Sequence, residues 1–200
     1  MRPGYSPALG ASFVLLGAAI LIAVTSCGSP ESPDAPSSRA CLERAIFGDP
    51  AQSPYVLPYP VGTSYPLLQS YCTPAGSHSG QLAYDFQMPI GTPITAAREG
   101  VAVSIMDAYT DDDRDNRHFN YIFIQHDDGT VAFYAHVELH SMTIQQNDRV
   151  MVGQHIANSG SCGTPIADLH FGVYQSWPAR DGNDLPVNFK NAQGPLLVKF

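Results

Sequence analysis

Apolar and polar residues alternate with a period of two along much of this chain, which is the pattern of half-buried β-strands. The clearest case is a predicted hairpin, with arms at 121–126 and 130–136 joined by a turn at 127–129, where an Asp-Asp-Gly sequence favours chain reversal. In the second arm, strict alternation places Tyr134 and His136 on the same face.

Several other segments carry a strand pattern or an extended one. Residues 54–72 are rich in proline and aromatic residues, which indicates extended chain and turns. Strands are predicted at 82–86, 94–97, 100–106 and 168–171, with weaker patterns at 144–155 and 171–174 and short strands or turns at 185–189. No long run outside the N-terminus has the 3.6-residue apolar period of a helix, so we expect an all-β domain.

The N-terminus has the pattern of a secretory signal. Arg2 precedes an apolar run at 11–24, and small residues lead to Cys27, so we expect residues 1–26 to be a signal peptide that forms a helix and is cleaved. The sequence Val-Thr-Ser-Cys at 24–27 resembles the lipobox of bacterial lipoproteins, in which the cysteine is acylated. An ordinary cleaved signal and an uncleaved membrane anchor are the alternatives, and all three place the domain in the cell envelope or outside it.

The Pro- and Ser-rich residues 27–40 are predicted to be a tether, and residues 41–200 to be one folded domain. Export permits disulfides, and with Cys27 lipidated three cysteines remain. A bond between Cys41 and Cys72 would attach the N-terminal lead-in to the domain and leave Cys162 free. Pairing of Cys72 with Cys162 stays open, because connectivity does not follow from sequence.

Charge excludes one class of partner. The net charge is -8, whereas nucleic-acid binding requires a surplus of lysine and arginine. Five aspartates lie in the segment 107–120 with little to bury, which predicts a solvated loop. Calcium binding by this loop is a weaker interpretation, since the spacing of the aspartates is not that of an EF-hand and the loop's arginines can neutralise their charge locally.

Three residues form a candidate metal centre. His78 follows a glycine-bounded loop, Asp85 lies seven positions later, and His170 lies on the strand at 168–171. Two imidazoles and one carboxylate are the ligand set of a catalytic zinc site, which keeps a position open for water. His136 is the candidate proton shuttle, and alternation places Asp168 on the same face as His170.

The remaining histidines receive structural interpretations. We expect His118, His140 and His155 to be surface side chains. His126, at the end of a strand, is expected to hold its turn or to support a site rather than to bind metal.

The order of motifs resembles that of the lysostaphin-type zinc metallopeptidases, which cut peptide cross-links in bacterial cell walls. The motifs are HSGQLAYDFQMPIGTPITAAREGVAV, YIFIQHDDGTVAFYAHV, NDRVMVGQHIANSGS and DLHFGV, and the resemblance covers residues 55 to 190 or so. It implies a single antiparallel β-sheet or sandwich-like core with long loops and a groove over the metal. It also implies that His78, Asp85 and His170 bind Zn²⁺, that His136 is catalytic, and that peptidoglycan peptides are the substrate.

The sequence departs from the family's pattern at two places. The commonest form has a shorter spacing between the first two ligands than the seven positions found here. The final motif is His-x-His in the family, and its first histidine, which assists the water, is Asp168 here. Asp168 would act as a general base, orient His136, or crowd the open metal position.

These departures leave three functions to compare. The first is a lipid-anchored zinc endopeptidase. The second is a catalytically degenerate module that binds peptidoglycan or, with a protein partner, activates another hydrolase. The third is a carbohydrate- or protein-binding β domain without metal.

Overall fold

The predicted hairpin is the centre of the main sheet in the computed structural model, which describes residues 38–74 and 76–192. Strands β5 (Tyr121–Gln125) and β6 (Val131–Ala135) pair antiparallel, and the residues of β5 alternate between half-buried and buried. The turn closes with a hydrogen bond of 2.8 Å from His126 N to Thr130 O. Gly129 adopts a φ of 85° in that turn, a backbone conformation that favours glycine.

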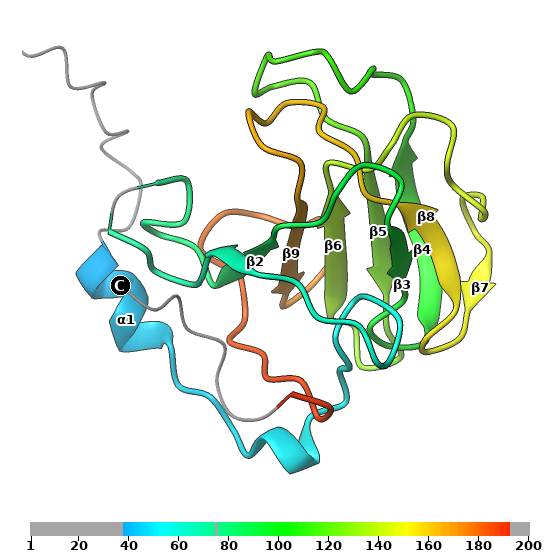
Figure 1. Ribbon diagram of the computed structural model, residues 1–200. Coiled ribbons are helices and arrows are strands. Elements are labelled where there is room, and N and C mark those ends of the chain that lie inside the picture. The colour runs from blue at the N-terminus through cyan, green and yellow to red at the C-terminus, as the bar shows by residue number, and fades with distance from the viewer. Residues whose placement is uncertain (1–37, 75, 193–200) are drawn as a thin grey trace, which may run out of the picture. The chain divides into compact units, whose positions relative to one another are not determined.

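Seven strands form one antiparallel sheet in the order β1-β2-β9-β6-β5-β4-β7 (Figure 1). Besides the hairpin, its members are β1 (Leu67–Gln69), β2 (Ala83–Phe86), β4 (Gly100–Met106), β7 (Arg149–Val150) and β9 (Leu169–Tyr174). Strand β9 therefore lies between β2 and β6, although it comes last in the chain. This position brings the C-terminal strand beside the two segments that carry the other candidate site residues.

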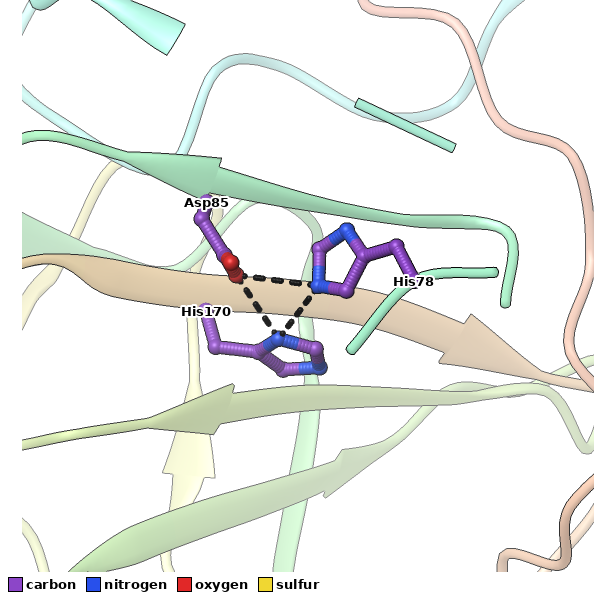
Figure 2. Close-up of side chains that lie close together, drawn as sticks. All are labelled: His78, Asp85 and His170. Carbon is purple, nitrogen blue, oxygen red and sulfur yellow. Dashed lines mark hydrogen bonds and ion pairs between the residues drawn. The ribbon is translucent and has the colours of Figure 1, made fainter. Parts of the chain in front are cut away.

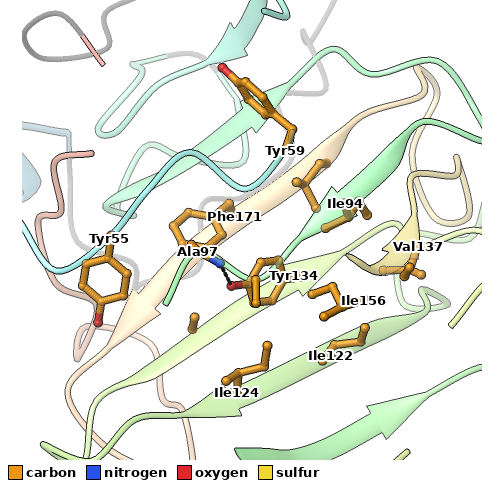
Figure 3. Packing of buried hydrophobic residues seen from close by; sticks show 14 of the residues in the cluster. Tyr55, Tyr59, Ile94, Ala97, Ile122, Ile124, Tyr134, Val137, Ile156 and Phe171 are labelled. Carbon is orange, nitrogen blue, oxygen red and sulfur yellow. Dashed lines mark hydrogen bonds between the residues drawn. The ribbon is translucent and has the colours of Figure 1, made fainter. Parts of the chain in front are cut away.

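A second sheet of two strands, β3 (Pro93–Thr95) and β8 (His155–Asn158), contributes to the core. Figure 3 shows Ile94 and Ile156 from this pair together with Ile122, Ile124 and Tyr134 from the large sheet. All five side chains are almost completely buried, so the apolar halves of the alternating strands are covered. The candidate site residues on β2 and β9 lie on the opposite face of the large sheet.

Two short helices precede the strands. Helix α1 (Ser38–Arg44) begins inside the segment predicted as tether, and the 3₁₀ helix η1 spans Pro50–Gln52. A disulfide joins Cys41 of α1 to Cys72, one of the two pairings that the sequence leaves open, and Cys162 is free and buried. The lead-in is thus covalently attached to the loop that follows β1.

The prediction of an all-β fold with a single large antiparallel sheet is confirmed. The segment 185–189 forms no strand, and an isolated bridge between Tyr174 and Asp184 immediately precedes it. All described residues belong to one compact unit, and none of their helices has the length and apolar character needed to cross a bilayer. The predicted signal peptide, Cys27 and the tether up to residue 37 lie outside the described residues.

Candidate metal centre

His78 lies in the loop between β1 and β2, and this loop is closed at its base. The backbone amide of Cys72 donates to the carbonyl of Gln81 at 2.9 Å, next to the disulfide. The His78 ring is fully buried, and its Nδ1 is 3.2 Å from the carbonyl oxygen of Ser70. Because a carbonyl only accepts hydrogen bonds, Nδ1 donates and Nε2 keeps a lone pair for a cation.

Asp85 and His170 are placed opposite each other by the pairing of β2 with β9. Their side chains meet on the face away from the core, with Asp85 Oδ1 2.8 Å from His170 Nδ1. The second carboxylate oxygen, Oδ2, accepts a hydrogen bond of 2.8 Å from Gln69 Nε2. Gln69, which sequence reasoning missed, pairs with Asp85 in the register of β1 and β2 and holds that carboxylate in place.

Three ligand atoms converge, as Figure 2 shows. His78 Nε2 is 3.1 Å from Asp85 Oδ1 and 3.1 Å from His170 Nδ1, and all three atoms lie within 4.8 Å of one another. Within residues 38–74 and 76–192, no other group of three such side chains comes together in this way. The donor set of two imidazole nitrogens and one carboxylate oxygen fits zinc, which prefers nitrogen and oxygen ligands of this kind in catalytic sites.

The electrostatics of Asp85 suit a cation ligand. Burial by itself would raise the pKa of its carboxyl group, but the neighbouring imidazole rings of His170 and His78 outweigh burial and hold the pKa well below its usual range. Asp85 is therefore ionised at neutral pH, and the site contains one fixed negative charge.

His136 follows β6 directly, and a change in backbone conformation brings its side chain to the face of the sheet that carries the candidate metal centre. Strict alternation predicted that it would share the core face with Tyr134, and that prediction is wrong. His136 adopts a φ of 62°, and its ring lies 6.0 Å from Phe119 and 6.3 Å from His170, centroid to centroid. The strand thus ends one residue early, and the left-handed conformation turns the imidazole toward the candidate metal centre.

The protonation state of His136 is set by its surroundings. Burial lowers its pKa to about 4, against an opposing hydrogen bond to the carbonyl oxygen of Cys162. That bond is 2.7 Å from Nδ1, so Nδ1 carries the proton and Nε2 is a free acceptor at neutral pH. The sequence indicates a role for the Cys162 thiol only, and no sequence pattern points to its carbonyl.

Asp168 is buried and joined to Gly160 by an isolated β-bridge. Burial and, to a smaller extent, the negative charge of Asp85 raise the pKa of its carboxyl group to about 8, against an opposing hydrogen bond with Thr164. Its Oδ1 has no hydrogen-bond partner among the described residues. The carboxyl group is neutral at pH 7, so it can donate a hydrogen bond, whereas the general-base role requires its ionised form.

The acidic loop 107–120 packs against the loop that precedes Asp168. Arg117 pairs with Asp115 at 2.5 Å, as the local neutralisation predicted from sequence requires. Arg114 behaves differently: its Nη1 donates to the backbone carbonyls of Ser161 and Thr164 at 2.6 and 3.0 Å. The loop therefore supports the 161–164 segment, which includes the Cys162 carbonyl.

The four other histidines lie apart from the three converging ligands. His126 Nδ1 contacts the Glu99 carbonyl at 2.7 Å and helps to hold its turn. His118 contacts Asp113 in the acidic loop, His140 contacts Asp107 at the start of that loop, and His155 contacts Asn158 within β8. The structure thus brings together His78, Asp85 and His170 with His136 beside them, and the roles of these residues stay predictions.

The chain is similar to a known protein family, to curated proteins and to solved structures. Residues 78–188 match the model of Peptidase family M23. The outer membrane antigenic lipoprotein B of Histophilus somni is 31% identical over 111 residues, which is 56% of this chain and 30% of that protein. The uncharacterized lipoprotein YgeR of Escherichia coli (strain K12) is 29% identical over 132 residues, 66% of this chain and 47% of that protein.

This chain therefore spans less than half the length of either relative. Among solved structures, LytU aligns with a TM-score of 0.50 and 22% identity, covering 62% of this chain and 82% of that one. At that identity the likeness concerns the fold.

Proposed function

Because the chain belongs to peptidase family M23, we propose that it is a zinc-dependent metalloendopeptidase that cleaves the peptide cross-links of bacterial peptidoglycan. The observation that carries the proposal is the convergence of His78 Nε2, Asp85 Oδ1 and His170 Nδ1, from one loop and two neighbouring strands. We assign these three residues as the zinc ligands. Zinc, when bound there, supplies Lewis-acid polarisation of a peptide carbonyl and activation of water.

The chain's own residues handle the protons and the developing charge. His136 offers an unprotonated Nε2, so it can take a proton from the attacking water and return it to the leaving amine. Asp168, in its protonated form, can donate a hydrogen bond to the oxyanion that forms on the scissile carbonyl. The two residues thereby share proton transfer and charge stabilisation.

Asp168 also favours a second candidate function. Where the family resemblance implies a histidine, this chain has a buried carboxyl group that is neutral at pH 7. In this alternative the protein is a catalytically degenerate member that keeps the ligands and the groove, binds peptidoglycan, or activates another hydrolase through a protein contact.

The place of action that we propose is the cell envelope. Both curated relatives are named as lipoproteins, and the Val-Thr-Ser-Cys sequence at 24–27 fits lipidation of Cys27 after removal of residues 1–26. Residues 27–40 would then tether a metallopeptidase domain at 41–200 to a membrane, with the net charge of -8 arguing against nucleic-acid partners.

The test combines two measurements on the purified protein. Elemental analysis should give one zinc per chain, and incubation with purified peptidoglycan should release soluble fragments. Asp85→Ala is the matched control and should lose both, because it removes the only carboxylate among the converging ligands.

The outcomes separate the candidates. Stoichiometric zinc without release, under conditions in which an active family member cuts, would reject the peptidase and support the degenerate module. Absence of zinc, with no uptake when zinc is added, would reject both and leave the metal-free binding domain.

A further inference from the structure

Six aromatic side chains form a continuous surface on the large sheet's face opposite to the core. We call it the aromatic surface, and its members are Phe119, Tyr121, Phe123, Phe133, Tyr174 and Trp177. The rings of Phe123 and Phe133 stack at 4.4 Å, and Trp177 meets Phe123 edge-on at 5.0 Å. Five of the six line a cleft of about 260 Å³, which Ala179, Arg180 and Asp181 close on one side.

This surface is distinct from the hydrophobic core. Ile122 and Ile124 of β5 point into the core and are fully buried, whereas Tyr121 and Phe123 on the other side of the same strand are only partly covered. Trp177 keeps 39% of its surface exposed. A contiguous group of large aromatic rings that are only partly covered indicates an interaction site.

The aromatic surface is continuous with the candidate metal centre. The Phe133 ring lies 5.5 Å from the ring of His170, and the Phe119 ring lies 6.0 Å from that of His136. A substrate whose scissile bond lies at His170 therefore reaches the aromatic surface with another of its parts. Successive ring contacts of 5.5, 4.4 and 5.0 Å lead from His170 through Phe133 and Phe123 to Trp177. The occupant is thus a more distant part of the same molecule, beyond the residues next to the bond that reacts.

We propose that the aromatic surface binds the sugar rings of the peptidoglycan glycan strand, an inference that rests on the proposed function for its choice of substrate. The peptide part of peptidoglycan consists mainly of small or charged residues, which have no flat apolar group to cover these rings. One face of a pyranose ring consists of C–H groups, and this apolar face packs against an aromatic ring. Arg180 and Asp181, exposed at the rim, can hydrogen-bond to the hydroxyl and acetamido groups.

The chain contains its own probe for this inference. Trp177 is the only tryptophan in the sequence, and it contacts Phe123 directly. Titration with a tetramer of N-acetylglucosamine, which has no peptide, should therefore change the intrinsic fluorescence saturably. Phe123→Leu keeps an apolar side chain but removes the flat ring, and it should weaken saccharide binding about tenfold while zinc content stays unchanged. Phe123→Tyr should restore binding.

Tyr65→Leu is the matched control, because this half-buried aromatic residue packs against Tyr59, away from the aromatic surface. It should bind the saccharide as the unsubstituted protein does. The inference is overturned if the tetramer gives no saturable signal by fluorescence or calorimetry, if Phe123→Leu binds normally, or if only an alanine-rich stem peptide changes the fluorescence. Saccharide binding needs no hydrolysis, so the two proposals can fail separately. A protein that binds the tetramer but does not cut peptidoglycan refutes the peptidase and keeps this inference. A protein that cuts peptidoglycan but does not bind the tetramer keeps the peptidase and refutes this inference.

Discussion

The Nδ1 atom of His136 lies 2.7 Å from the carbonyl oxygen of Cys162, which fixes the tautomer of the imidazole. The same backbone segment that carries this carbonyl is held by Arg114 from the acidic loop. Two loops far apart in the sequence thus determine which nitrogen of His136 faces the candidate metal centre. Because Nε2 is left without a proton, the residue is prepared to act as a base.

His136→Ala should retain zinc and lose turnover. The substitution removes the proton acceptor but leaves His78, Asp85 and His170 in place, so kcat should fall by about 10²–10⁴-fold, the usual range for a general base. Zinc content and peptidoglycan hydrolysis measured on the same sample test this. His170→Ala is the contrasting variant, which should lose most of its zinc. Retained activity in His136→Ala would remove this residue from the mechanism.

Asp168→His tests whether the carboxyl group impairs or supports activity. The substitution introduces the histidine that the family resemblance implies at this position. If the degenerate interpretation holds, hydrolysis should rise; if the site is adapted to a neutral carboxyl group, hydrolysis should fall. We expect a fall of about 10²–10³-fold in kcat, the usual cost of one lost oxyanion donor. Asp168 is buried, so the larger imidazole has to displace its neighbours and does not place its N–H where the carboxyl group donates. An unchanged rate would exclude Asp168 from both roles.

The ligand set could be predicted from sequence more readily than the residues around it. Alternation places His170 on the same face as Asp168, and the family resemblance joins His170 with His78 and Asp85. His136 reaches the site only because its backbone leaves the strand conformation, with a φ of 62° that the alternation rule does not include. Gln69 and the Cys162 carbonyl come from long-range packing and from the backbone, which no residue pattern records.

Arg114→Ala should lower hydrolysis about tenfold without loss of zinc. Its guanidinium group donates to carbonyls of the 161–164 segment, so its removal should loosen the acceptor of His136. Arg117→Ala is the matched control, since that arginine pairs only with Asp115 in its own loop and is exposed. Equal rates for Arg114→Ala and Arg117→Ala would show that the support is not needed for activity.

Removal of the disulfide should weaken zinc binding as well as stability. The Cys41–Cys72 bond closes the base of the loop that carries His78, across a sequence separation of 31 residues. The double variant Cys41→Ser and Cys72→Ser should lose about 2–4 kcal/mol of unfolding free energy. It should also release zinc at lower chelator concentration, because the His78 ring is positioned less firmly. Zinc retention equal to that of the disulfide-bonded protein would show that the disulfide does not support zinc binding.

Acid destabilisation should include a contribution from His126, a buried residue far along the hairpin from the candidate metal centre. Burial lowers the pKa of its imidazole below the ordinary value of about 6.5, against the opposing hydrogen bond to the Glu99 carbonyl. The unfolded chain therefore binds this proton more tightly than the folded one. The stabilisation from the neutral ring is complete above a pH of about 6.5 and is lost as the pH falls through the folded-state pKa.

His126→Asn isolates that contribution, because the asparagine amide can still donate to the Glu99 carbonyl in place of Nδ1 but does not titrate. Urea unfolding should show the free energy of unfolding falling more steeply for the unsubstituted protein than for His126→Asn between about pH 7 and pH 5. Any loss of metal in acid is common to both proteins and cancels in the comparison. His155→Asn removes an exposed imidazole instead and serves as the control. Parallel pH profiles for the protein and His126→Asn would show that the buried ring does not contribute to acid destabilisation.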